Sequence, residues 1–196
     1  MKIVIVDRDG TINVEREGYI HTPEEWEPLP GALDAIARLN HAGFQVVIAA
    51  NMPGLGRGLF DMGALNAIHA RMNKQLAAVG GRVEAVFFCP HAPTEDCSCR
   101  KPLPGLFLQI GERYKLNLSQ VHAVGDSIRD VKAAAAAGCI PHLVMSGLGA
   151  PESTDPLPPE FPAGTRVHAD LAEFATTFIA EMEAASEAPP TAPPAP

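Results

Sequence analysis

Short apolar runs alternate along the chain with longer segments in which apolar residues recur at helical spacing. The short runs are rich in valine and isoleucine, as buried strands are. We expect strands at residues 2–7, 44–50, 83–88, 121–126 and 140–145. We expect helices between them, at residues 30–43, 61–81, 104–115 and 128–138. Strands that alternate with helices predict an α/β fold, an open parallel sheet with helices on both faces.

Residue types at the element boundaries agree with this pattern. Pro30 and Pro104 lie at the starts of two predicted helices, where a missing backbone N–H costs little. Asp61 is a candidate N-cap, and Gly138 directly follows a predicted helix end. Residues 146–166 are rich in proline and glycine, which predicts a loop.

The C-terminal part of the chain is expected to contain one more helix and a tail. Asp170 and Glu173 have the spacing of a capping box, so a helix is predicted from there to about Met182. Residues 185–196 are rich in proline and alanine and cannot contribute to a core. We therefore predict a single domain over residues 1–184, followed by a disordered tail.

Composition and charge narrow the class of protein. Of the 196 residues, 46% are hydrophobic and 19% are charged, which is typical of a soluble globular domain. The net charge of -8 opposes binding to a nucleic-acid backbone, although cations gathered at one site could hold a small anion. The sequence contains neither a recognisable signal peptide nor an apolar run of about 20 residues. We therefore expect a cytoplasmic protein with reduced thiols, no membrane contact and no nucleic-acid partner.

Acidic residues directly follow two of the predicted strands. Asp7 and Asp9 lie in DRDGT after the first strand, and Asp126 lies in GDSIRD after the fourth. The carboxyl ends of parallel strands share one edge of the sheet, where ligands bind. Asp–Gly turns often end strands without any function. Two such motifs, with Lys101 between them in sequence, nevertheless predict a magnesium site made of hard oxygen donors.

These side chains have the chemistry for phosphoryl transfer. A carboxylate can attack phosphorus to form an aspartyl-phosphate, which water then hydrolyses. A second carboxylate two residues further on lies on the same side of an extended segment. It could protonate the leaving alcohol and later deprotonate the water. Magnesium and a lysine would balance the charge on the transferred group.

Three of the four cysteines lie with a histidine in a stretch of eleven residues. The potential ligands are Cys89, His91, Cys97 and Cys99. Three thiolates and one imidazole match a closed, tetrahedral structural Zn²⁺ site. A disulfide is disfavoured in a reducing compartment, and a nucleic-acid-binding zinc module is disfavoured by the net charge. Zinc would order the loop and direct Arg100 and Lys101 towards a phosphate. The other cysteine and most of the remaining histidines are interpreted as packing or surface residues: His41, His69, His122, His142, His168 and Cys139.

The motifs resemble those of the haloacid dehalogenase (HAD) superfamily of phosphatases. Over roughly residues 1–150 the chain is similar to the D-glycero-D-manno-heptose 1,7-bisphosphate 7-phosphatases. The residues that carry this similarity are DRDGTIN, GYIH, GLGRG, CPH…CSCRKP and VGDS. The resemblance implies a Rossmann-like HAD domain without a large cap domain. It also implies a phosphorylated sugar as substrate, in the synthesis of ADP-heptose for lipopolysaccharide. The absence of a cap favours a monomer.

The resemblance assigns a role to each matching residue. Asp7 would be the nucleophile and Asp9 the general acid/base, while Lys101 would hold the phosphoryl group and Arg100 would help to recognise the substrate. Magnesium would be bound by Asp7, the backbone carbonyl of Asp9, and Asp126. The remaining substrate contacts are expected from two loops, at Arg16, Glu17, Gly18, Tyr19, Ala50, Asn51 and Arg57.

One motif departs from the family pattern and leaves other functions open. Where the family has Thr-Asn-Gln-Ser after the second strand, this chain has Ala50-Asn51-Met52-Pro53. Loss of one preorganised donor can lower a rate on the order of 10²–10³-fold. A low-activity protein that binds phosphosugar is therefore one alternative. Histidinol-phosphate phosphatase and a zinc-dependent interaction module are the others.

Overall fold

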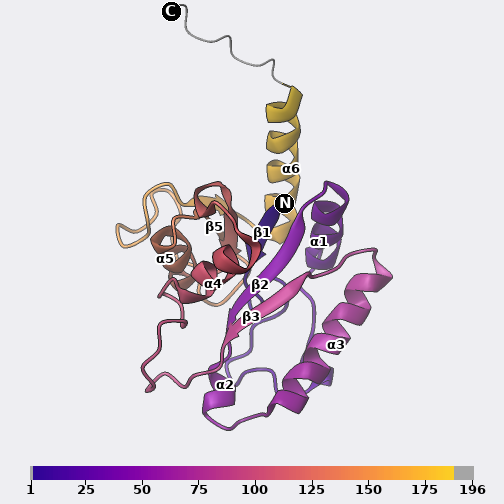
Figure 1. Cartoon of the computed structure of the whole chain (residues 1–196), viewed down its shortest axis with the longest axis vertical. Helices are drawn as coiled ribbons and strands as arrows, with labels where there is room; N and C mark the ends of the chain where they lie inside the picture. Colours follow the sequence, from indigo (N-terminus) through magenta and orange to yellow (C-terminus); the bar gives the residue numbers. More distant parts are fainter. Residues whose placement is uncertain (1, 188–196) are drawn as a thin grey trace, which may run out of the picture.

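Residues 2–187 are described by a computed structural model, in which the strands form one parallel sheet (Figure 1). The strands are β1 (Ile3–Val6), β2 (Gln45–Asn51), β3 (Ala85–Cys89), β4 (His122–Gly125), β5 (Ile140–Val144) and β6 (Arg166–His168). Their order is β3-β2-β1-β4-β5-β6, and each neighbouring pair is parallel. The predicted α/β fold with an open parallel sheet is therefore confirmed.

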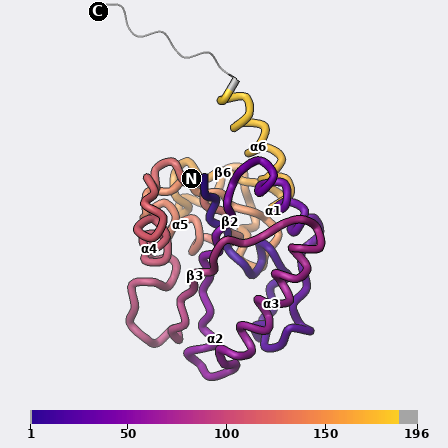
Figure 2. Tube along the Cα trace, turned by 45° about the vertical axis from the view of Figure 1, so that its right-hand side comes forward, coloured from indigo at the N-terminus to yellow at the C-terminus, as the bar shows by residue number. Residues whose placement is uncertain are grey.

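Helices cover both faces of this sheet. The helices of the described residues are α1 (Ala32–His41), α2 (Pro53–Gly56), α3 (Met62–Ala78), α4 (Gly105–Tyr114), α5 (Ile128–Ala136) and α6 (Leu171–Glu187), with 3-10 turns η1 (Pro23–Glu25) and η2 (Leu118–Gln120). The short α2 lies beyond the end of β2 rather than on a face (Figure 1). Residues of α1, α3 and α6 pack in one apolar cluster against the sheet, and residues of α4 and α5 pack in another. Figures 1 and 2 show α4 and α5 on the opposite side of the sheet from α1 and α3.

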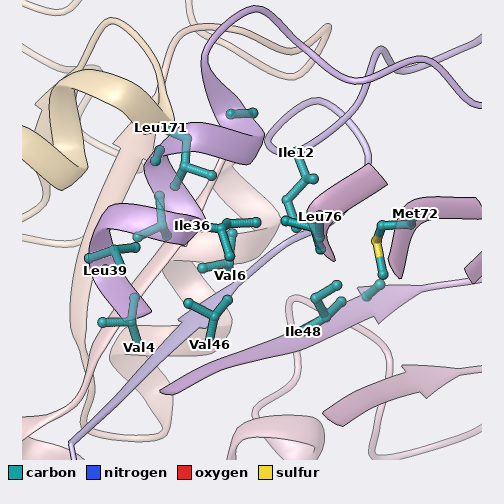
Figure 3. Packing of buried hydrophobic residues seen from close by; sticks show 14 of the residues in the cluster. Val4, Val6, Ile12, Ile36, Leu39, Val46, Ile48, Met72, Leu76 and Leu171 are labelled. Atoms are coloured by element: carbon teal, nitrogen blue, oxygen red, sulfur yellow. The ribbon is translucent and has the colours of Figure 1, made fainter. Parts of the chain in front are cut away.

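The larger apolar cluster explains why the strand sequences are so uniformly apolar. Alternate strand residues such as Val4 and Val46 contribute to this cluster, while their neighbours Ile5 and Val47 contribute to the cluster on the other face. Because both faces are covered by helices, both sets of alternating positions in the central strands β1 and β2 are mainly apolar. Figure 3 shows the larger cluster, in which strand side chains meet Ile36, Leu39, Met72, Leu76 and Leu171.

The C-terminal third differs from the sequence-based prediction in two ways. β6 lies at the end of the segment that was predicted to be a loop, because three residues are too few to show an alternating pattern. α6 continues to Glu187, beyond the predicted end near Met182, since good helix formers follow and the next proline is Pro189. Residues 185–187, predicted to belong to the disordered tail, are therefore the last residues of α6, and the rest of the predicted tail lies outside the described residues.

Three of the histidines interpreted as packing residues are linked to one another. His122 Nδ1 lies 2.8 Å from His142 Nε2, and His142 Nδ1 lies 2.9 Å from His168 Nε2. We call these three side chains the histidine chain. It crosses β4, β5 and β6 beneath the rings of Phe174 and Phe178 on α6. Sequence reasoning missed this chain because the three residues become neighbours only when the strands pair.

The strand order places the site. The chain leaves β1 towards β2 on one side, whereas β4 pairs with β1 on the other side. Such a switch point opens a crevice at the carboxyl ends of the strands. The longest stretch without helix or strand between described elements is residues 145–165, so no cap domain covers this crevice within residues 2–187. In the same part of the chain, no helix is both long enough and apolar enough to cross a membrane.

Candidate active site

Three carboxylates meet at the switch point. Asp7 follows β1, Asp126 follows β4, and Asp130 lies in the first turn of α5. One oxygen from each lies within 4.8 Å of the others. We call these residues the acidic cluster. The backbone of Gly10 makes room for it: its φ is +78°, and a Cβ there would lie 2.6 Å from Asp126 Oδ2. The glycine of DRDGT is therefore required both for its conformation and for the close approach.

A buried lysine is paired with the acidic cluster. Lys101 Nζ lies 2.6 Å from Asp7 Oδ1 and 2.5 Å from Asp130 Oδ1, and it also donates to the carbonyl of Ala49 at 2.8 Å. Its side chain is only 3% exposed. The amide of Asn51 bonds the backbone N and O of Lys101 at 3.0 and 3.1 Å. Asn51, predicted as a substrate contact, therefore also holds the lysine in place.

The charges in this cluster do not balance. Burial, with repulsion from Asp130 and Asp9, raises the pKa of Asp7 to about 7 against the attraction of Lys101. Burial, with repulsion from Asp7 and Asp130, raises the pKa of Asp126 to about 8. One ammonium group faces three carboxylates, so the site favours a divalent cation. Its oxygen donors fit Mg²⁺.

Asp130 is a site residue to which sequence reasoning assigned no role. Burial acts to raise its pKa, but the charge of Lys101 and hydrogen bonds from Lys101 and Ser127 outweigh burial and lower the pKa. The backbone N of Ser127 donates to Asp130 Oδ2 at 3.0 Å and its hydroxyl donates at 2.5 Å, which forms a capping box at the start of α5. The signal was present as the Ser-x-x-Asp spacing within GDSIRD.

A cavity of about 560 Å³ opens above the acidic cluster. Most of the predicted site residues line it, namely Asp7, Asp9, Arg16, Glu17, Tyr19, Asn51, Arg57, Arg100, Lys101 and Asp126. Gly18 and Ala50 are not among the lining residues. The side chain of Ala50 is 1% exposed and packs in the larger apolar cluster, so contact with substrate there would have to come from the backbone. Arg129, which was not predicted, also lines the cavity.

Part of the wall of this cavity comes from the loop around Tyr19 and from Arg57, at the end of α2. Tyr19 adopts a left-handed backbone conformation with φ 68°, and the guanidinium of Arg57 lies 5.8 Å from the centre of its ring. His21 Nε2 lies 2.6 Å from the carbonyl of Gly18. A strained tyrosine beside a functional cavity indicates that the loop is held in one shape by its surroundings.

Arg100 lines the cavity and also makes hydrogen bonds to the backbone of the preceding loop. Its guanidinium donates to the carbonyls of His91 and Pro93 at 3.1 Å each, and to that of Ala92. These carbonyls belong to the loop that carries the cysteine ligands. Arg100 therefore ties this loop together, while its predicted role in substrate recognition stays a prediction.

The cysteine and histidine ligands of the loop converge. Cys89 Sγ and Cys99 Sγ lie 3.4 and 3.3 Å from His91 Nδ1, and Cys97 Sγ lies 3.7 Å from Cys89 Sγ. A tetrahedral zinc site with bonds of about 2.0–2.3 Å separates its ligands by about 3.5–3.8 Å. All four cysteines of the chain are free thiols. The donor set and its spacing therefore fit Zn²⁺.

Comparisons with known proteins agree with this geometry. A family described as haloacid dehalogenase-like hydrolase matches residues 1–138. The D-glycero-beta-D-manno-heptose-1,7-bisphosphate 7-phosphatase of Bordetella bronchiseptica is 50% identical over 92% of this chain and 99% of its own length. The enzyme of the same name from Pseudomonas aeruginosa is 45% identical over 90% of this chain and 97% of its own length.

Solved structures give the same result. The crystal structure of the B. bronchiseptica D,D-heptose 1,7-bisphosphate phosphatase, complexed with magnesium and phosphate, has a TM-score of 0.88 and covers 92% of this chain and 99% of its own. The corresponding phosphatase from Burkholderia thailandensis is 45% identical, with a TM-score of 0.71, and covers 91% of this chain and 99% of its own.

Proposed function

We propose that this chain is a magnesium-dependent phosphatase. It belongs to the haloacid dehalogenase-like hydrolase family and, within that family, to the heptose 1,7-bisphosphate 7-phosphatases. Its substrate would be D-glycero-D-manno-heptose 1,7-bisphosphate, from which it removes the 7-phosphate. The observation that carries this proposal is the acidic cluster with its buried Lys101 at the base of a cavity walled by arginines.

The residues of the site divide the reaction into two steps. Asp7 attacks phosphorus while the bond from phosphorus to the sugar oxygen breaks, and Asp9 gives a proton to that oxygen. Water then attacks the aspartyl-phosphate, Asp9 takes up a proton, and the bond to Asp7 breaks. Lys101 balances negative charge on the transferred group. A magnesium ion, held by Asp7, Asp126 and the Asp9 carbonyl, would supply further positive charge at the phosphoryl oxygens.

The cavity wall has the charge that a bisphosphate requires. Arg16, Arg57 and Arg129 line the cavity, in a protein whose net charge is -8. Cations gathered in one place attract an anion even when the whole protein repels it. The volume of about 560 Å³ lies in the usual range for a small-molecule site. We therefore assign these arginines to the second phosphate and to the sugar.

Phosphate release from heptose 1,7-bisphosphate in the presence of magnesium tests the proposal. The native chain should turn over this substrate faster than histidinol phosphate, and removal of magnesium should abolish the reaction. Binding without turnover would instead support the low-activity phosphosugar-binding protein. Preferred turnover of histidinol phosphate would make the substrate assignment wrong.

The product of the proposed reaction would enter the synthesis of ADP-heptose. We expect this reaction to take place in the cytoplasm, and we expect the enzyme to act as a monomer.

We further propose that Cys89, His91, Cys97 and Cys99 hold a structural Zn²⁺. The supporting observations are the convergence of the four ligands and the position of Lys101 two residues after the last of them. Metal analysis should find about one zinc per chain, and Cys99→Ser should lose it and lower kcat about tenfold or more. Cys139→Ser is the matched control, because this buried thiol lies outside the cluster. Full activity of zinc-free protein would contradict the proposal.

A further inference from the structure

Arg8 is a buried cation that the reaction, as described above, does not use. It lies between Asp7 and Asp9 in the sequence, and its side chain is only 2% exposed. Its Nε donates to Asp9 Oδ1 at 3.0 Å and its Nη2 donates to Asp9 Oδ2 at 2.9 Å. Such a two-point contact fixes the plane of a carboxylate as well as its position.

The two oxygens of Asp9 are left in different states. Oδ1 accepts from Arg8 Nε and also from Asn13 Nδ2 at 2.9 Å, which uses both of its lone pairs. Oδ2 accepts one hydrogen bond, from Arg8 Nη2, among the residues that the structure describes. One lone pair of Oδ2 is therefore free, on a side chain that is 27% exposed and lines the cavity.

Arg8 also contacts a side chain of α3. Its Nη1 lies 3.4 Å from Nε2 of His69 on α3. Burial, with the positive charge of Arg8, lowers the pKa of His69 to about 4. A neutral imidazole protonated on Nδ1 can accept from Arg8, and α3 thereby helps to fix the guanidinium.

We propose that Arg8 is a positioning residue for the general acid/base, and that Oδ2 of Asp9 is the atom that carries the proton. This inference rests on the proposed phosphatase function. In the first step the proton on Asp9 Oδ2 moves to the leaving sugar oxygen as its bond to phosphorus breaks. In the second step the attacking water returns a proton to Oδ2 as the bond from phosphorus to Asp7 breaks.

Kinetics can distinguish a positioning role of Arg8 from a merely structural one. If Arg8 acts through Asp9, its removal should slow proton transfer and leave substrate binding intact. Arg8→Gln should then lower kcat on heptose 1,7-bisphosphate about tenfold or more and change KM less than about threefold. Release of p-nitrophenol from p-nitrophenyl phosphate in the first turnover should change less than about threefold, because this weakly basic leaving group needs no proton.

A double-mutant cycle provides the decisive readout. In the Asp9→Asn background, Arg8→Gln should lower kcat by less than about twofold, since the group that it positions has already been lost. Arg8→Lys retains the positive charge but cannot make the two-point contact with the Asp9 carboxylate, so its loss of kcat should be intermediate. Arg71→Gln removes an exposed arginine from α3 and should leave kcat unchanged. Thermal unfolding of each variant shows whether it is folded, and the Lys variant replaces the Gln variant if the latter does not fold.

Two results would overturn the proposal. One is the same fold loss from the Arg8 substitution with and without Asp9→Asn. The other is an equal loss of first-turnover rate on the aryl and alkyl phosphates. A native chain that hydrolyses another primary alkyl phosphate but not heptose 1,7-bisphosphate would make the proposed substrate wrong, and the cycle would then use that phosphate. A native chain without any phosphatase activity would contradict both the proposed function and the proposed role of Arg8.

Discussion

Two polar groups of side chains meet β4 at different points, the acidic cluster at Asp126 directly after the strand and the histidine chain at His122 within it, and they differ in what they require. The acidic cluster places three carboxylates around the single ammonium of Lys101. The histidine chain places three imidazoles in a row, and each ring nitrogen between neighbours has a partner. In the acidic cluster negative charge exceeds positive charge, whereas in the histidine chain neighbouring rings pair with one another. Imbalance of buried charge, rather than burial of polar groups, distinguishes the reactive region.

The two regions also respond to pH in opposite directions. In the metal-free protein, the raised pKa values of Asp7 and Asp126 mean that the folded state binds more protons than the unfolded chain between about pH 4 and 8. The acidic cluster is therefore less stable as the pH rises. Burial, with the neighbouring histidines, lowers the pKa of His142 to about 2, so the histidine chain is less stable as the pH falls.

The largest effect on activity should come from Asp7→Asn. This substitution removes the proposed nucleophile, and phosphate release should fall about 10³-fold or more. It also removes one of three competing negative charges, so thermal unfolding of the metal-free protein should occur at the same temperature or a higher one. Asp34→Asn is the matched control, because Asp34 is an exposed residue of α1. Retained activity would mean that another group attacks phosphorus.

The largest effect on stability should come from the histidine chain. His142→Leu leaves His122 and His168 without their shared partner in a buried position, which should lower the free energy of unfolding by about 2–4 kcal/mol. The kcat should change less than about twofold, since the chain lies outside the cavity. Denaturant unfolding measures the loss, with His41→Leu on the exposed side of α1 as a control. Loss of activity in folded protein would remove the distinction between the two regions.

A smaller effect should appear in how the stability difference between the native protein and the His142→Leu variant depends on pH. His142 titrates near pH 6.5 in the unfolded chain and far lower in the folded protein, so below pH 6.5 the unfolded state binds more protons. The native protein therefore loses stability on acidification that the His142→Leu variant does not lose. The stability difference between them should shrink by about 1 kcal/mol per pH unit from pH 6.5 to 5. A difference independent of pH would show that His142 is not proton-linked to folding.

The smallest effect should come from Ala50, at the border between the reactive region and the core. Its side chain packs in the larger apolar cluster, so the hydroxyl introduced by Ala50→Thr would be buried away from the cavity. The kcat should change less than about threefold, and the free energy of unfolding should fall by about 1 kcal/mol. A gain of tenfold or more would show that the missing hydroxyl matters and that the reactive region extends to this position.

The sequence alone was sufficient for the fold class and for most of the residues that line the candidate site. Alternation of apolar runs and amphipathic segments predicted the parallel sheet, because strands covered on both faces are mainly apolar. Asp7 and Asp126 could be assigned to one edge because each directly follows a strand. The four proposed zinc ligands lie within eleven residues of one another, so their spacing in the sequence alone pointed to a metal site.

Contacts between distant segments could be decided only by the tertiary structure. Asp130 gains its role from Lys101, the histidine chain forms across three paired strands, and Arg8 is oriented with the help of α3. Ala50 was assigned to the site from its motif, and the structure shows that its side chain packs in the core, so that only its backbone could contact substrate. A motif specifies which groups are available near a strand end. The direction of a side chain and the balance of buried charge depend on strand register and helix packing, which local sequence does not encode.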